Sequence, residues 1–220
     1  MTRKAKSLPP VPLAPLRKVL SGITGFDEIT NGGLPVGRTI LVRGGPGCGK
    51  TVFAMQVLVN RARDHREAGI LVAFEERADQ IVANAATLGW NIPALAAKKL
   101  FFVDANLSSR VDAAAEIDLT KELNLLRAYV REAGAKYIVF DGIDVLLRSL
   151  ADPQAELREI YRLREWILES GLTAIITQKS GLSDDDTKQG YSILPFMADC
   201  VITLSHHVLA GSSFRNLRVT

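Results

Sequence analysis

Residues 44–51 read Gly-Gly-Pro-Gly-Cys-Gly-Lys-Thr, and this stretch decides the fold. It matches the phosphate-binding loop pattern G-x-x-x-x-G-K-[ST]. The apolar run at 39–42 predicts a buried strand before the loop, and residues 52–58 predict the start of a helix after it. The glycines allow the backbone to curve around a polyphosphate, and the helix N-terminus adds a positive dipole end. The sequence therefore predicts a nucleoside triphosphate site.

Two side chains of this loop have predicted roles. Lys50 would reach the β- and γ-phosphates, and the Thr51 hydroxyl would hold Mg²⁺. The alternative is a glycine-rich turn between a strand and a helix that binds nothing. The eight-residue spacing together with the strand–loop–helix context favours nucleotide binding.

Length and composition indicate one globular domain. The chain has 220 residues and is 47% hydrophobic, which is enough for one substantial core. No apolar run approaches the ~18 residues that would span a membrane, and the N-terminus is too rich in proline for a signal peptide. The two cysteines provide no disulfide framework, so we expect a reducing, cytoplasmic setting.

Charge divides the chain into two predicted parts. The formal net charge is +3, but residues 1–18 carry five cations, no acid and four prolines. We interpret 1–18 as an extended basic arm, either a solvated tail or a contact for an anionic partner. Residues 19–220 are slightly acidic and form the predicted globular domain, which is poorly suited to binding nucleic acid.

Strand and helix patterns alternate along that domain. This alternation predicts an α/β fold, a mostly parallel sheet with helices on both faces and ligands at the carboxyl ends of its strands. The predicted helices cover 50–66, 78–88, 119–133 and 153–170. The predicted strands are Thr39–Arg43, Ile70–Phe74, Leu100–Val103, Tyr137–Phe140, Thr173–Thr177 and Val201–Leu204.

Three strand ends carry polar residues that suit phosphate chemistry. Asp141 follows an apolar strand and could hold Mg²⁺ through water, although such an acid by itself usually marks a strand end. Glu75 and Glu76 follow another strand, and one could accept a proton from attacking water; the alternative is a pair of exposed acids opening a helix. Thr177 and Gln178 could sense the γ-phosphate, and a capping amide is the competing interpretation.

In this order, these segments resemble the RecA superfamily, and within it the KaiC-type ATPases. The residues that carry the resemblance are Gly25-Phe26-Asp27-Glu28, residues 32–38, Phe74-Glu75-Glu76 and Gly89-Trp90. The resemblance implies a RecA-like fold, an Mg²⁺-dependent ATPase, and hexameric rings with ATP between subunits. It also implies that Glu75 is the catalytic base with Glu76 assisting, and that Lys50 contributes to catalysis. The predicted nucleotide-binding residues are Gly45, Pro46, Gly47, Cys48, Gly49, Lys50, Thr51, Val52 and Thr87. Of these, the resemblance implies that Gly47 to Val52 line the triphosphate and that Thr87 lies near the nucleotide.

The chain departs from the family pattern at two places. Self-phosphorylating KaiC kinases carry a Ser-Thr pair before the late strand, whereas this chain has Pro195 and Phe196, which argues against autokinase activity. The family's Lys-x-Arg segment, which reaches a neighbouring γ-phosphate, would lie just beyond Thr220. We therefore expect a fragment or truncated form with weakened hydrolysis.

Three functions remain open on the sequence. The first is a slow KaiC-like ATPase in assembly, signalling or timing, with signalling proteins as partners. The second is a RecA- or RadA-type DNA-dependent ATPase; three consecutive aspartates at 184–186 argue against DNA binding there. The third is a nucleotide-gated scaffold that binds ATP and hardly hydrolyses it.

Overall fold

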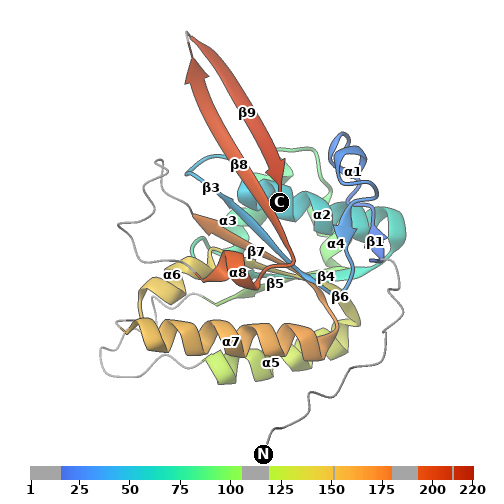
Figure 1. Ribbon diagram of the computed structural model, residues 1–220. Coiled ribbons are helices and arrows are strands. Elements are labelled where there is room, and N and C mark those ends of the chain that lie inside the picture. Colours follow the sequence, from blue (N-terminus) through green and yellow to red (C-terminus); the bar gives the residue numbers. More distant parts are fainter. Residues whose placement is uncertain (1–15, 106–118, 151, 180–192, 210) are drawn as a thin grey trace, which may run out of the picture.

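The computed structural model describes residues 16–105, 119–150, 152–179, 193–209 and 211–220. Within these residues the chain forms a seven-stranded sheet in the order β5-β4-β6-β7-β3-β8-β9 (Figure 1). Its strands are β3 (Thr39–Gly44), β4 (Ala68–Ala73), β5 (Leu100–Asp104), β6 (Ala135–Asp141), β7 (Thr173–Lys179), β8 (Cys200–Leu209) and β9 (Ser212–Val219). All neighbouring pairs are parallel except β8 and β9, which are antiparallel.

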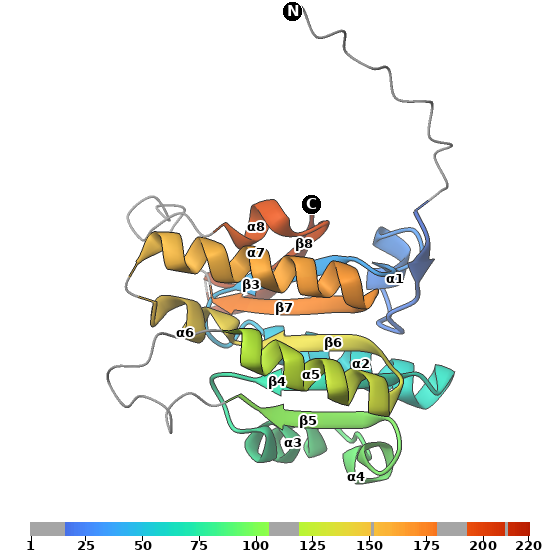
Figure 2. The same ribbon diagram turned by 90° about the horizontal axis from the view of Figure 1, so that it is seen from below.

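Helices cover both faces of the sheet. They are α1 (Phe26–Ile29), α2 (Lys50–His65), α3 (Ala78–Ala86), α4 (Ile92–Ala96), α5 (Leu119–Ala133), α6 (Ile143–Arg148), α7 (Pro153–Ser170) and α8 (Leu194–Met197). Helices α5 and α7 lie below the sheet in Figure 1 and α2 lies above it. Seen from below, α5 and α7 cross in front of the strands (Figure 2). A small antiparallel pair, β1 (Lys18–Val19) with β2 (Leu34–Pro35), precedes β3.

Successive strand residues point into two separate cores. In β6, Val139 packs with α2, while its neighbours Ile138 and Phe140 pack with α5 and α7. In β3, Ile40 packs in the core with α2, and Leu41 packs in the core with α5 and α7. Because side chains alternate along a strand and both faces are covered, the central positions of these strands are apolar on both faces. This explains the uninterrupted apolar runs in the sequence and confirms the predicted α/β fold with a mostly parallel sheet.

The six predicted strands and the four predicted helices are all present, with ends that shift by a few residues. The strand predicted at 70–74 runs over Ala68–Ala73, and the helix predicted at 78–88 ends at Ala86. The sequence prediction did not include β9, which pairs with β8 in a hairpin that extends beyond the body of the domain (Figure 1). The aspartates at 184–186 and residues 1–15 of the predicted arm lie outside the described residues.

One polar cluster joins the far end of the sheet to α2. Glu67 forms ion pairs with Arg61 and Lys136 and accepts a hydrogen bond from the Tyr137 hydroxyl at 3.0 Å. Burial by itself raises the pKa of Glu67, but the three donors outweigh it and lower that pKa to about 2. The cluster therefore helps to fix the start of β4 against α2 and β6.

A membrane span would need a long apolar helix, and none of the helices in the described part of the chain meets that requirement.

Candidate functional site

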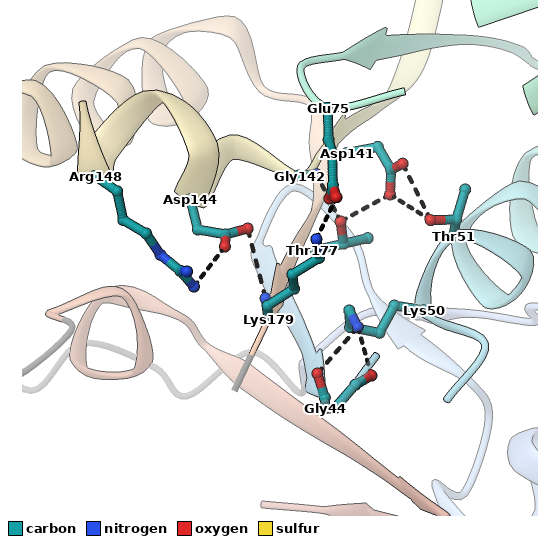
Figure 3. Close-up of polar contacts among 11 residues, drawn as sticks. Gly44, Lys50, Thr51, Glu75, Asp141, Gly142, Asp144, Arg148, Thr177 and Lys179 are labelled. Carbon is teal, nitrogen blue, oxygen red and sulfur yellow. Dashed lines mark hydrogen bonds and ion pairs between the residues drawn. The ribbon is translucent and has the colours of Figure 1, made fainter. Parts of the chain in front are cut away.

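The carboxyl ends of β3, β4, β6 and β7 meet at one edge of the sheet (Figure 3). Parallel strands bring their carboxyl ends to the same side, and β6 and β7 lie between β4 and β3. The topology thus gathers residues that are more than a hundred positions apart in the chain. The loop after β3, Glu75 after β4, Asp141 at the end of β6 and Lys179 at the end of β7 form the candidate site.

The loop itself begins at Gly44, the last residue of β3, and leads directly into α2. Gly47 and Gly49 have φ values of 71° and 94°, which L side chains rarely adopt. At Gly44 a Cβ atom would lie 2.2 Å from the carbonyl oxygen of Leu204 in β8. Glycine is therefore required at the start of the loop for close packing and inside it for backbone conformation.

Lys50 folds back over this loop. Its ammonium donates to the carbonyl oxygens of Gly44 at 3.0 Å and Gly45 at 2.8 Å (Figure 3). Burial lowers the pKa of Lys50, and the nearby Lys179 ammonium acts in the same direction. An anion beside Lys50 would counter both effects, so the position is electrostatically prepared for a phosphate.

Asp141 is the centre of a buried hydrogen-bond network. The Thr51 hydroxyl lies 3.0 and 3.1 Å from its two carboxylate oxygens, and the Thr177 hydroxyl donates to one of them at 2.7 Å. The backbone N–H of Gly142 in turn donates to the Thr177 oxygen at 2.8 Å. Asp141 is 5% exposed, and burial raises the pKa of its carboxyl group. Thr177 thus contacts the acid that sequence analysis assigned to the metal.

Glu75 extends over the same edge and forms an ion pair with Lys179 (Figure 3). Its side chain packs against Gly142, where a Cβ atom would lie 2.9 Å from that of Glu75. Both partners of the ion pair remain partly open to solvent, with side-chain exposures of 42% and 36%. The carboxylate of Glu75 is accordingly accessible to water and to a ligand in the site.

Glu76 points elsewhere. Its carboxylate accepts a hydrogen bond at 2.8 Å from the side-chain amide of Asn84 in α3. The chain bends over residues 74–76 directly after β4, and the two adjacent carboxylates leave it in different directions. Thr87 caps the end of α3, and its hydroxyl donates to the Asn84 carbonyl at 2.6 Å. Glu76 and Thr87 therefore belong to the α3 side of the loop after β4.

The remaining predicted residues lie in the phosphate loop or directly beside it. Pro46 and Gly47 are exposed at its tip, and Cys48 is half-buried. Val52, in the first turn of α2, is 44% exposed. Gln178 pairs in register with Arg43, one residue before the loop begins.

Sequence analysis missed two charged residues of this edge. The buried carboxylate of Asp144 forms an ion pair with Arg148 at 2.8 Å and accepts the backbone N–H of Lys179 at 3.5 Å. Lys179 itself pairs with Glu75, 104 positions earlier. Neither residue belongs to a local motif. The available signal for Lys179 was position alone, because it lies two residues after the predicted strand that ends at Thr177.

Comparison with known proteins agrees with this geometry. A family model described as "ATPase: KaiC" matches residues 19–220. The chain is 39% identical over 206 residues to the "Circadian clock protein KaiC2" of a Synechocystis species, covering 93% of this chain and 36% of that protein. It is 34% identical to the "Circadian clock oscillator protein KaiC" of Parasynechococcus marenigrum, covering 91% of this chain and 39% of that protein.

A solved structure resembles the whole described fold. The KaiC-like protein of Pyrococcus horikoshii OT3 has a TM-score of 0.78 and 31% sequence identity, and the match covers 93% of this chain and 88% of that one. The chain spans well under half the length of the curated relatives it matches.

Proposed function

The chain belongs to the KaiC family of ATPases, and from this premise we propose that it binds ATP with Mg²⁺ at residues 44–51 and hydrolyses it slowly. One observation carries the proposal. The Thr51 hydroxyl of the phosphate loop lies 3.0 Å from the Asp141 carboxylate, beside the ammonium of Lys50. A loop cation and a hydroxyl–carboxylate pair are the parts that P-loop ATPases use for the phosphates and the metal.

The donor atoms suit Mg²⁺. This ion prefers oxygen ligands, retains several waters, and binds through a small number of protein groups together with the phosphates. The oxygens of Thr51 and Asp141 are already adjacent, and burial of Asp141 favours a compensating cation. Thr51 would hold the ion directly and Asp141 through water. When bound, Mg²⁺ neutralises charge on the phosphate oxygens.

Backbone and side-chain groups of the chain bind the phosphates, stabilise the developing charge and orient Asp141. The loop N–H groups and the α2 N-terminus bind phosphate oxygens, with Gly45 to Val52 lining the triphosphate. Lys50 moves from the two loop carbonyls to the β- and γ-phosphates and stabilises the developing negative charge. Thr177 orients the Asp141 carboxylate through its 2.7 Å hydrogen bond. Sensing of the γ-phosphate by Thr177 or Gln178 stays a prediction, as does a contact between Thr87 and the nucleotide.

We assign the general base to Glu75. Its carboxylate lies over the site and accepts the proton as water attacks the γ-phosphorus; the bond to the bridging oxygen breaks, leaving ADP and phosphate. Glu76 assists by bracing the loop through Asn84. The partial exposure of Glu75 supports this assignment, because the attacking water must reach it.

Autophosphorylation is not part of the proposal. The positions that correspond to the kinases' hydroxyl pair are Pro195 and Phe196 in α8. Neither side chain can accept a phosphoryl group, and Phe196 is 82% exposed. Water is therefore the proposed acceptor.

We further propose that ATP supports assembly into a homo-oligomeric ring, a hexamer with ATP between subunits, that serves signalling or timing through protein partners. The extended β8–β9 hairpin supports an assembly role, because Val208 and Phe214 are 68% and 50% exposed on it. The hairpin register places these two side chains on opposite faces, so each face offers one apolar side chain to a neighbouring subunit. Two free cysteines are compatible with a cytoplasmic setting.

The test measures Mg²⁺-dependent ATP binding and hydrolysis per protomer over a wide range of protein concentration. We expect Lys50→Ala to abolish ATP binding, and the double variant with Glu75→Gln and Glu76→Gln to bind ATP without hydrolysing it. A rate per protomer that rises with concentration would support sites completed between subunits. Absence of ATP binding by the unaltered chain would refute the proposal, and normal hydrolysis by the double variant would refute the general-base assignment.

A further inference from the structure

We propose that Lys179 is the residue through which this site distinguishes ATP from ADP. Its ammonium pairs with Glu75, and on ATP binding it transfers to the γ-phosphate and releases the carboxylate. The inference rests on the proposed ATP site and adds to it a cation that the phosphate-loop motif does not contain.

The register of the sheet places Lys179 directly beside the phosphate loop. In the parallel pairing of β3 with β7, Lys179 lies opposite Gly44, the first residue of the loop. Strand β7 also neighbours β6, which ends at Asp141. Lys179 therefore leaves the sheet between the loop that binds phosphates and the acid assigned to the metal.

The side chain of Lys179 lies within reach of the groups that would act on the γ-phosphate. Its ammonium contacts the Glu75 carboxylate, while its backbone N–H is held by the buried Asp144 carboxylate at 3.5 Å (Figure 3). Lys50 lies at the same edge, with its ammonium on the carbonyls of Gly44 and Gly45, so two lysines border the phosphate loop. Two neighbouring cations at the carboxyl edge of a sheet suit a polyphosphate.

The ion pair can exchange partners at little cost. Both of its side chains are more than a third exposed, and exposed ion pairs contribute little to stability. A terminal phosphate carries more negative charge than a carboxylate and has several acceptor oxygens. ATP therefore competes successfully for Lys179, whereas ADP has no γ-phosphate to offer and leaves the ion pair intact. A ligand shifts such an equilibrium only through its different affinity for the two arrangements.

The exchange has a consequence for the general base. The Glu75 oxygen that contacts the Lys179 ammonium is occupied by that contact and does not accept a hydrogen bond from the attacking water. Transfer of Lys179 to the γ-phosphate frees the Glu75 oxygen for the attacking water at the moment when the substrate is present. Lys179 thereby couples recognition of the third phosphate to activation of the base.

The experiment compares dissociation constants for ADP and for the β,γ-imido analogue of ATP, both with Mg²⁺, by titration calorimetry on the full chain. We expect Lys179→Met to weaken the analogue about tenfold, equivalent to about 1.4 kcal/mol, and to change ADP affinity less than about twofold. Lys179→Arg should retain most of the preference for the analogue. The matched control is Lys136→Met, which removes a lysine from an ion pair with Glu67 at the opposite end of the sheet and should alter neither constant.

A second variant tests the exchange from the other side. Glu75→Gln removes the competing carboxylate, so we expect the analogue to bind several-fold tighter. This gain in affinity should shrink when Lys179→Met is added to Glu75→Gln. Equal effects of Lys179→Met on both nucleotides, no effect on either, or a gain that persists in the double variant would overturn the inference. If the unaltered chain bound neither nucleotide, the proposed ATP site itself would fail, which is a separate result.

Discussion

Replacing Thr177 by valine would remove one hydroxyl from the centre of the site and keep nearly the same side-chain volume. That hydroxyl donates to the Asp141 carboxylate at 2.7 Å and accepts the Gly142 N–H at 2.8 Å, and Thr177 is only 2% exposed. A hydrogen bond to a charged group contributes about 1.5–3 kcal/mol, and a buried N–H without a partner costs about 1–3 kcal/mol. We therefore expect Thr177→Val to lower the free energy of unfolding by about 3–5 kcal/mol.

The same strand supplies a matched control. Thr173 lies at the other end of β7, is also 2% exposed, and accepts the Gly37 N–H at 2.9 Å. Thr173→Val thus loses one backbone hydrogen bond and no contact with a carboxylate, and should cost about 1–3 kcal/mol. For a domain of this size each kcal/mol corresponds to about 2–4 °C in Tm. The difference between the two variants isolates the contact with Asp141.

The pH dependence of the free energy of unfolding further distinguishes loss of the contact with Asp141 from loss of a backbone hydrogen bond. Burial raises the pKa of Asp141 above its unfolded value, so its ionisation opposes folding, and stability falls as pH rises through the folded pKa. The Thr177 hydroxyl lowers that pKa and reduces the loss. In chelator and without nucleotide, urea unfolding at pH 8 should show a wide difference in stability between Thr177→Val and Thr173→Val. The difference should narrow as pH falls towards 3.8, the ordinary pKa of an aspartate. Equal stabilities of the two variants, or a gap independent of pH, would refute this reasoning.

Three further outcomes follow from the fold and the composition. Glu67→Gln should lower the free energy of unfolding by about 1–3 kcal/mol at pH 7. Because the folded pKa of Glu67 is lowered to about 2, the difference in stability between the variant and the unaltered chain should shrink below pH ~4.5 and vanish near pH 2. A difference that is the same at all pH values would contradict this expectation. Phe214→Asp on the hairpin should lower the mass of any ATP-dependent assembly in sedimentation while leaving the thermal unfolding of the protomer within about 2 °C; an unchanged assembly would exclude this surface. Short single-stranded DNA at physiological salt should neither bind below micromolar concentration nor stimulate ATP hydrolysis, and either effect would favour a RecA-type function.

Elements with strong local patterns were predictable from the sequence. The apolar run at 137–140 and the loop at 44–51 each determine their own conformation, since a strand covered on both faces needs apolar residues and the loop needs glycine at positive φ. Strand β9 was missed because its side chains are mostly exposed and it depends on pairing with β8. An exposed hairpin leaves no apolar run in the sequence.

The residues of the candidate site also differ in whether a local sequence pattern marks them. Lys50, Thr51 and Asp141 were predictable because a motif or a strand end marks each of them. The partners of Glu75 and Glu76 were not, since Lys179 and Asn84 meet them only through the packing of separate elements. Which of two adjacent acids faces the site is decided by the direction of the chain after β4.

The packing at Gly44 also joins the nucleotide loop to the hairpin mechanically. With no side chain between them, the loop backbone rests directly on the Leu204 carbonyl of β8, the strand that continues outward into the hairpin. A displacement of the hairpin would therefore be transmitted to the phosphate loop through direct backbone contact, with no flexible side chain between them to absorb it. Conversely, a displacement of the loop backbone would be transmitted directly to β8 and from there to the hairpin.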